Sequence, residues 1–435
     1  MSKLRKHKKF IFAAITVLTI VVAVNLHSLS SGSKEAEFTQ TAPPVPLNQL
    51  MSNSMSDCEN TRKFDNAILR FMRYWDIKGG SFALMRNDSL LYAKGYGYAN
   101  LADSTECDVK HIFRVASVSK LITAVAVLHL CERGQLSPDD YVFGEEGILN
   151  DTLFLSYRDK NIKKITVDHL LRHTSGFSNP HGDAAFNMEL VAAYLDKPLP
   201  LSMDDMVLYA TKNKLRAKPG GRYNYSNLGY IVLSKVVEKV SGLPYEQYVK
   251  DSVLAPIGCY DIHLANNYSE GFRENEVDYY EVREAEPVPA FDGRDTLVMK
   301  SHGGNDVHGL YGAGGWVASP VELLKLVSAI NKCTNKENFL TSETIDFMTP
   351  YQKNSKPAGW ASSNSKTWLR SGSMSGTSAL IKAEENGYTW VFISNSSSWN
   401  GPGLSRQMNR DITKAILRVK EWPKVDWFSL TEQTI

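Results

Sequence analysis

Apolar and polar residues follow two different periods in the first part of the chain. Residues 61–74 carry apolar side chains at helical spacing, which predicts an amphipathic helix. Residues 81–85 and 90–98 instead combine aromatic and aliphatic residues around a polar stretch at 86–89. This pattern predicts two strands joined by a turn.

Helical patterns dominate the middle of the chain, between about 117 and 265. Residues 121–133 are apolar on nearly all sides, which predicts a buried helix. Two more helices are predicted at 167–172 and 230–240. The second of these is followed by Ser-Gly-Leu-Pro at 241–244, and glycine followed by proline is typical of a helix end.

Strand patterns return near the C-terminus. Residues 379–383 and 388–394 flank Glu-Glu-Asn-Gly at 384–387, which predicts a hairpin, and residues 404–419 predict a final helix. Because the strands come from both ends of the chain, we expect an α+β fold. Its antiparallel sheet is formed from both chain ends, is flanked by helices and is interrupted by a mostly helical insertion.

The composition and charge of the chain exclude several classes of protein. The chain has 435 residues, of which 43% are hydrophobic and 22% charged, so it is neither disordered nor fibrous. The formal net charge of +2 is dominated by a cluster at the N-terminus, and the remainder is mildly acidic. We therefore expect no nucleic-acid partner. The basic cluster consists of Lys3, Arg5, Lys6, Lys8 and Lys9.

The sequence also offers no convincing metal or cofactor site. The five cysteines lie far apart without a C-x-x-C pair, which argues against zinc and iron–sulfur sites. His169 and His173 have the spacing of a zinc metalloprotease helix, but Leu170 occupies the place of the required Glu. We expect neither a metal nor a cofactor.

The N-terminus predicts export. Residues 10–24 carry no charge and follow the basic cluster, so residues 1–27 are expected to be a signal or a membrane anchor. Cleaved signal and uncleaved anchor both remain open, with residues 10–26 as the segment held by the inner membrane in the second case. The catalytic part would then be periplasmic or otherwise extracytoplasmic. Residues 28–60 are rich in Ser, Thr, Gln and Pro and predict a flexible tether.

The first candidate for chemistry is the S-x-x-K pattern of Ser117 and Lys120 at the start of the buried helix. Residues three apart share a helix face, and burial should lower the pKa of the lysine so that it could act as a base. S-x-x-K also occurs at 31–34 and 363–366, in polar stretches. The alternative is a helix-capping serine with a lysine that extends to solvent.

The second candidate is Tyr225-Ser226-Asn227, in a turn-rich loop before a predicted helix. A tyrosine hydroxyl can relay a proton, and the Asn227 amide can orient a substrate amide or carbonyl. The alternative is a loop tyrosine that packs its ring.

The third candidate is the segment from Arg370 to Gly376, just before the hairpin. The arginine could pair with a carboxylate, and the glycines allow close approach of the backbone to a ligand. The alternative is a simple turn.

In this order the three segments resemble the penicillin-recognising serine hydrolases. The similarity is greatest to the branch of class C β-lactamases, D-alanyl-D-alanine carboxypeptidases and serine esterases. That family has S-x-x-K, Y-x-N, and K-T-G or H-x-G; this chain has Ser117–Lys120, Tyr225–Asn227 and Arg370-Ser371-Gly372. Further similarity lies in residues 113–117, 170–176, 219–220 and 312–315.

The resemblance implies a β-lactamase/transpeptidase-like domain at 61–420. Its sheet part would comprise 61–115 and 300–420, and its helical part 116–299. The nucleophile would lie between the two parts, at the N-terminus of a buried helix.

The resemblance also implies a role for each matching residue. Ser117 would be the nucleophile, Lys120 and Tyr225 the acid–base pair, and Asn227 a contact to the substrate amide. Arg370, Ser371, Gly372 and Ser373 would bind substrate, with the backbone N–H groups of Ser117 and Ser373 as the oxyanion hole.

Arg370 departs from the family pattern, which has Lys or His at that position. Arginine keeps the charge but cannot shuttle a proton, so the substrate class stays open. We expect an exported serine hydrolase that acts on a small-molecule or peptide substrate of the cell envelope, namely an ester, a D-amino peptide or a β-lactam. The alternative is a non-catalytic or slowly turning-over receptor of cell-wall fragments.

Overall fold

The computed structural model describes residues 44–177, 182–331, 338–352 and 355–432. The predicted signal or anchor at 1–27, and the predicted tether up to residue 43, lie outside the described residues. From Val45 onward the chain forms one compact unit. No helix of the described residues is both long enough and apolar enough to cross a membrane.

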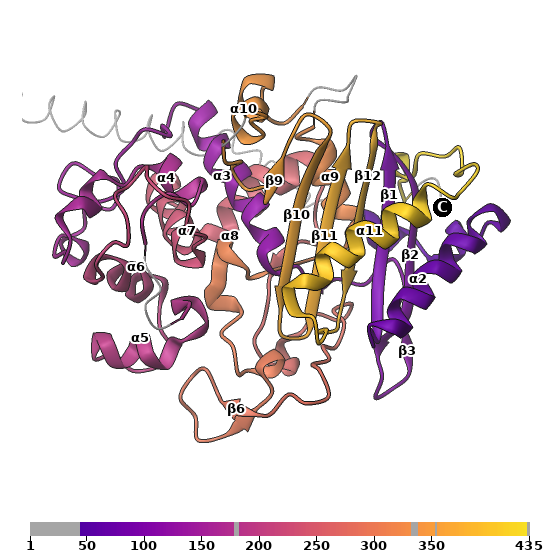
Figure 1. The fold of residues 1–435 in the computed structure, drawn as a ribbon, viewed down its shortest axis with the longest axis horizontal. Helices are drawn as coiled ribbons and strands as arrows, with labels where there is room; N and C mark the ends of the chain where they lie inside the picture. The colour runs from indigo at the N-terminus through magenta and orange to yellow at the C-terminus, as the bar shows by residue number, and fades with distance from the viewer. Residues whose placement is uncertain (1–43, 178–181, 332–337, 353–354, 433–435) are drawn as a thin grey trace, which may run out of the picture. The chain divides into compact units, whose positions relative to one another are not determined.

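The helices and strands follow one another in the order that the hydrophobic pattern indicates, with the long strands near both ends of the chain and most helices between them (Figure 1). The helices are α2 (Arg62–Tyr74), α3 (Ser119–Glu132), α4 (Val167–Leu171), α5 (Met188–Leu195), α6 (Met203–Lys212), α7 (Asn227–Ser241), α8 (Tyr245–Tyr248), α9 (Pro320–Ser328), α10 (Ser342–Met348) and α11 (Leu404–Ile416). The strands are β1 (Gly79–Arg86), β2 (Ser89–Asn100), β3 (Thr105–Glu106), β4 (Phe113–Arg114), β5 (His263–Leu264), β6 (Val288–Pro289), β7 (Leu297–Val298), β8 (Trp316–Ala318), β9 (Ser362–Ser363), β10 (Thr367–Met374), β11 (Thr377–Glu384) and β12 (Tyr388–Ser394).

Both ends of the chain build the main sheet, as expected for the α+β fold. Within the described residues this sheet has seven strands in the order β3-β2-β1-β12-β11-β10-β9. The centre is the antiparallel pair β1 and β12, in which Gly80 lies opposite Ser394 and Arg86 opposite Tyr388. The predicted hairpin at 379–394 is the β11–β12 pair.

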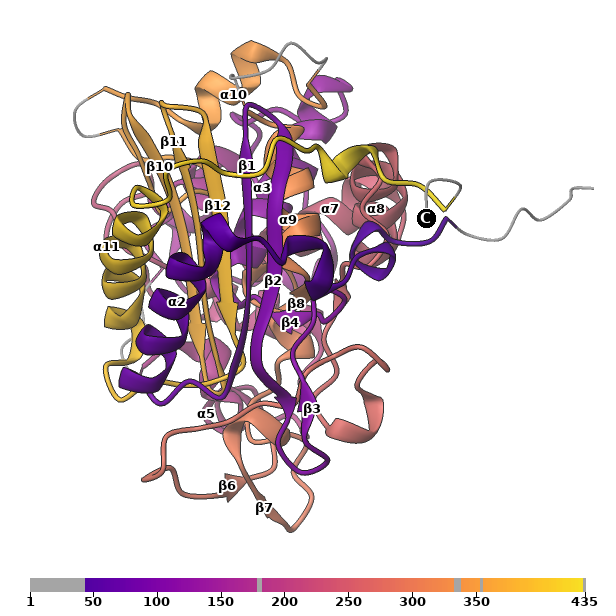
Figure 2. The same cartoon turned by 90° about the vertical axis from the view of Figure 1, so that its right-hand side faces the viewer.

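The sheet separates two hydrophobic cores because successive side chains of a strand point to opposite faces. Phe82 and Leu84 of β1 face the helices α2 and α11, which lie side by side on one side of the sheet (Figure 2). Ala83 and Met85 face the larger core, which includes α3, α7 and α9. The sheet therefore carries a helical layer on each face.

The segment before α2 differs from the predicted tether at 28–60. Residues 47–50 form a short 3-10 helix, and the side chains of Leu47 and Met51 are only 4% exposed within the larger core. Asn48 Nδ2 donates to Asp261 Oδ2 at 2.8 Å and to the Lys110 carbonyl at 2.9 Å. The prediction relied on the polar composition of this stretch and missed that Leu47, Met51 and the amide of Asn48 are buried. The folded unit therefore begins before residue 61.

The insertion between the two sheet segments is helical only in its first part. Helices α3 to α8 occupy 119–248, whereas much of 265–310 is loops and short strands. Strand β8 pairs with β4 and β5 in a separate small sheet. This small sheet holds the segment that leads into Ser117.

Candidate active site

Ser117 lies where the chain passes from the small sheet into α3. It belongs to a 3-10 turn at Ala116–Val118, and between His111 and Leu128 it is the one residue that is not buried. Ala116 has a φ of +48°, a conformation that non-glycine residues rarely adopt. Such strain is typical of functional positions, and here it directs the neighbouring serine toward a cleft.

The cleft has a volume of about 300 Å³ and collects seven of the eight residues that the sequence singled out. Ser117, Tyr225 and Asn227 line it from the helical side. Residues 370–373 line it from strand β10. Lys120, the eighth residue, lies fully buried directly beneath Ser117.

Ser117 is within reach of two groups that can move a proton. Tyr225 Oη is 2.8 Å from Ser117 Oγ, and Lys120 Nζ is 3.3 Å from the same oxygen. Lys120 Nζ also donates to Asn227 Oδ1 at 2.6 Å and to the Ala313 carbonyl at 2.5 Å. An ammonium group has three protons, and these three acceptors match them.

The charges of this cluster shift both proton-transfer groups toward neutral pH. The pKa of Lys120 is lowered to about 8, because burial outweighs the opposing effect of Tyr225 and the charge of Arg370 adds to the lowering. For Tyr225, burial alone would raise the pKa. The nearby charges of Lys120 and Arg370 and hydrogen bonds from Lys120 and Ser117 outweigh burial and lower the pKa to about 7.

Tyr225 is held in place by a buried histidine that the sequence analysis considered only as a possible metal ligand. The His173 ring packs against the Tyr225 ring with centroids 4.5 Å apart and the planes tilted by 35°. Its Nδ1 accepts a hydrogen bond from the Ser226 N–H at 3.2 Å, and its carbonyl accepts one from the Asn224 N–H at 2.8 Å. Burial keeps the pKa of His173 well below its usual value, so the ring is neutral. His169, the other member of the pair, caps the start of α4.

Strand β10 runs directly against the nucleophile segment. A Cβ atom at Gly372 would lie 2.2 Å from the Val115 carbonyl oxygen and 2.9 Å from the Ser117 nitrogen. Only glycine permits this approach. It brings the backbone around Ser117 and Ser373 together, as the expected oxyanion hole requires. The assignment of the two N–H groups remains a prediction.

Arg370 lines the cleft, but its side chain is mostly buried beneath Ser117 and Tyr225. It is 2% exposed, Nε donates to the Ser117 carbonyl at 2.6 Å and Nη2 donates to Tyr225 Oη at 3.2 Å. The sequence did not reveal these two contacts, because they join segments far apart in the chain. The contact of Arg370 with a substrate carboxylate remains a prediction.

Two further contributors were missed from the sequence. Asp183 Oδ2 accepts a hydrogen bond from Asn227 Nδ2 at 2.6 Å and thereby orients the amide so that Oδ1 faces Lys120. The Ala313 carbonyl is the third acceptor of Lys120. Ala313 stands in the Gly-rich stretch that carried the family resemblance, whereas Asp183 belongs to no recognisable motif.

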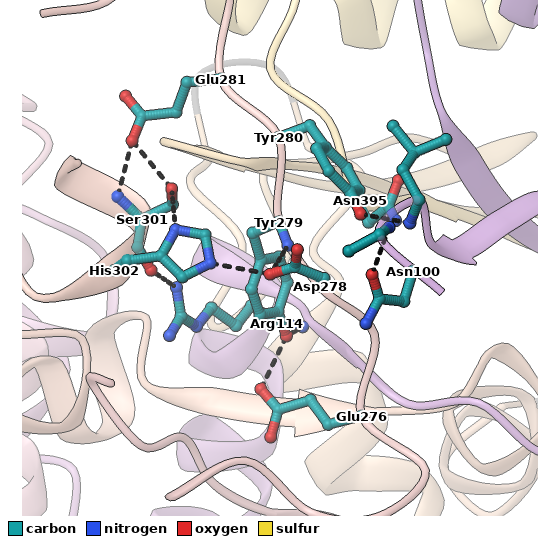
Figure 3. A network of polar contacts seen from close by, with 12 residues as sticks. Asn100, Arg114, Glu276, Asp278, Tyr279, Tyr280, Glu281, Ser301, His302 and Asn395 are labelled. Carbon is teal, nitrogen blue, oxygen red and sulfur yellow. Dashed lines mark hydrogen bonds and ion pairs between the residues drawn. The ribbon is translucent and has the colours of Figure 1, made fainter. Parts of the chain in front are cut away.

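A buried polar network supports the strand that leads into Ser117 (Figure 3). Arg114 donates to the carbonyls of Ser301 and Asn266 at 2.6 and 2.7 Å, and its guanidinium lies 4.2 Å from the centre of the Tyr279 ring. The loop at 265–302 is thus attached to the residue three positions before the nucleophile.

The fold and the arrangement of serine, lysine and tyrosine define the class of penicillin-recognising serine hydrolases. The Beta-lactamase family matches residues 64–414, and the chain belongs to this family. The resemblance seen in the sequence is therefore confirmed.

Individual relatives are distant. PbpX of Bacillus subtilis strain 168 is 25% identical over 338 residues, which is 75% of both chains. Penicillin-binding protein 4* of the same organism is 26% identical, over 51% of this chain and 45% of its own length. Among solved structures, D-amino acid amidase from Ochrobactrum anthropi SV3 superimposes with a TM-score of 0.65 at 18% identity, over 84% of this chain and 100% of its own. This last similarity shows the shared fold.

Proposed function

We propose that the protein is a serine hydrolase that cleaves an ester or amide through an acyl-enzyme on Ser117. The observation that carries the proposal is the position of Ser117 Oγ, 2.8 Å from Tyr225 Oη and 3.3 Å from Lys120 Nζ, in an open cleft. A nucleophile, a base and a cation within hydrogen-bonding reach form the arrangement that covalent catalysis needs.

Tyr225 is the better candidate for the base. Because the Lys120 ammonium already faces three acceptors, it favours the charged form and stabilises a Tyr225 phenolate. The phenolate accepts the Ser117 Oγ proton as Oγ bonds to the substrate carbonyl carbon. The carbonyl oxygen becomes an anion held by backbone N–H donors. Tyr225 then passes the proton to the leaving group as the old bond breaks.

Deacylation reverses the proton path. A water molecule gives its proton to Tyr225 while its oxygen attacks the acyl carbon. Tyr225 then returns the proton to Ser117 Oγ as the acid product leaves. The chain supplies every proton carrier that these two half-reactions use.

The test is labelling of Ser117 with a fluorescent fluorophosphonate and a fluorescent penicillin, followed by turnover of p-nitrophenyl esters. We expect wild type to be labelled and to turn over at least one ester, and Ser117→Ala to do neither. Ser119→Ala is the matched control. Ser119 is fully buried and out of reach of the probe, so this variant should be labelled like wild type. A fluorophosphonate that marks Ser117→Ala as strongly as wild type would contradict the proposal.

We further propose that the enzyme works outside the cytoplasm on a cell-envelope substrate. The support is the basic cluster and apolar stretch at the N-terminus. A fusion of residues 1–60 to alkaline phosphatase, which is active only after export, tests this. Full phosphatase activity is expected, and an inactive fusion that accumulates in the cytoplasm would refute export.

A further inference from the structure

The cleft lining provides few positively charged groups that could bind an anion. Among its described lining residues, Arg370 is the only cation, and its side chain is 2% exposed. The remaining lining is mostly apolar or hydroxyl-bearing, for example Phe186, Leu310, Met374 and Ser373. A carboxylate placed here would lose hydration without gaining a counter-charge.

Two of the three guanidinium nitrogens of Arg370 are already bonded within the site. Nε donates to the carbonyl of Ser117 itself, and Nη2 donates to the hydroxyl of Tyr225. A carboxylate that paired with these two nitrogens would have to displace the nucleophile's backbone and the proposed base. The Ser117 carbonyl would then be an acceptor without its partner.

From these observations we propose that the cleft selects esters and amides whose leaving group bears no carboxylate, and that Arg370 is a positioning residue rather than a substrate contact. The inference rests on the proposed hydrolase function and narrows its substrate class. Simple esters and carboxamides fit, whereas leaving groups with a free carboxylate, such as a C-terminal amino acid, do not.

A matched pair of esters tests this on the wild-type protein. Acetate esters of 3-hydroxybenzamide and of 3-hydroxybenzoate have the same acyl group and nearly the same shape, and they differ in one negative charge. We expect kcat/KM for the benzamide ester to be higher by about tenfold or more, because the carboxylate loses hydration without gaining a full set of partners. Equal or faster turnover of the benzoate ester would overturn the selectivity. Failure of both esters would instead count against the hydrolase function.

Arg370→Met separates the two roles of the arginine. If Arg370 positions Tyr225 and Ser117, both esters slow by the same factor, and the acid limb of the kcat/KM profile moves to higher pH because Tyr225 loses a cationic donor. If Arg370 instead binds the carboxylate, only the benzoate ester slows and the acid limb stays in place, which would overturn the proposal. Arg418→Met, at an exposed position after α11, is the control and should change neither quantity. Should Arg370→Met fail to fold, the wild-type ester ratio still decides the selectivity.

Discussion

The behaviour of single residues in this site follows from one buried cation. Lys120 is fully buried, and its three acceptors include the nucleophile and an amide that Asp183 orients. Because water does not screen the charge of Lys120, this charge lowers the pKa of Tyr225. The pKa values of Lys120 and Tyr225 therefore both lie near neutral pH. Proton transfer between Ser117 and Tyr225 is therefore possible under physiological conditions.

The first prediction concerns pH. Tyr225 must be deprotonated to act as the base, so kcat/KM should fall as the pH drops below about 7. Lys120 must remain protonated, so activity should also fall as the pH rises above about 8. Tyr225 and Lys120 interact, so the two apparent pKa values of the bell-shaped profile describe the pair and not the single residues. A profile for p-nitrophenyl acetate checks this, and a flat rate from pH 5 to 9 would contradict it.

The second prediction concerns Gly372. A methyl group there would collide with the Val115 carbonyl oxygen, so Gly372→Ala should push β10 away from Ser117. We expect kcat to fall by about 100-fold, the usual cost of losing one oxyanion donor.

Gly229→Ala is the matched control for this change. Its added Cβ would lie 3.6 Å from the nearest side chain, at an ordinary contact distance within α7. Activity should be retained, with stability equal or slightly higher because alanine favours helices. Equal losses in the two variants would argue against a special role for Gly372.

At the scale of elements, the periodic patterns predicted most of the fold. The helix at 61–74, the strands around 86–89 and the 384–387 hairpin all appear within a few residues of their predicted bounds. Strand β10 was harder to place, because Arg, Ser and Gly in succession are also typical of a turn. In the structure these residues form a strand that pairs with β11 across the tight turn at Ser375-Gly376, with Met374 opposite Thr377.

The short helix at 47–50 was missed for a related reason. A segment as short as 45–51 shows no clear hydrophobic period, and its burial depends on distant partners such as Asp261, which binds Asn48. In the site, motifs located the groups that react, but not the direction of Arg370 or the role of Asp183. Both depend on contacts between segments far apart in the sequence.

The third prediction concerns this N-terminal helix. Asn48→Ala removes two hydrogen bonds to buried acceptors and should lower the free energy of unfolding by about 1–3 kcal/mol. Gln49→Ala, which loses one longer bond of 3.3 Å to the same carboxylate, should cost less. Urea unfolding measures both. Labelling of Ser117 should persist in both variants, and an unchanged midpoint for Asn48→Ala would show that the helix is dispensable.

At the scale of the whole molecule, the sheet part and the helical part share one hydrophobic core. Ala83 of β1, Leu121 of α3 and Ile231 of α7 belong to the same buried cluster. The cleft lies where these parts meet, with Tyr225 from the helical part and β10 from the sheet. The site is therefore complete only when both parts are folded.

The fourth prediction follows from this shared core. On heating, far-UV circular dichroism and the capacity of Ser117 to react with fluorophosphonate should be lost in a single transition at one temperature. Two resolved transitions, with helical signal lost before the strands, would show that the parts fold independently.

The pairing of β1 with β12 also determines when the main sheet can form during synthesis of the chain. Gly80 leaves the ribosome before its partner Ser394 has been made, more than 300 residues further along the chain. Throughout that interval the β1–β2 hairpin exposes an unpaired edge and an apolar face, which are the features that lead nascent chains to associate. Strands that are neighbours in the sheet are therefore synthesised far apart in time. We expect this protein to depend on chaperones until strand β12 has been made.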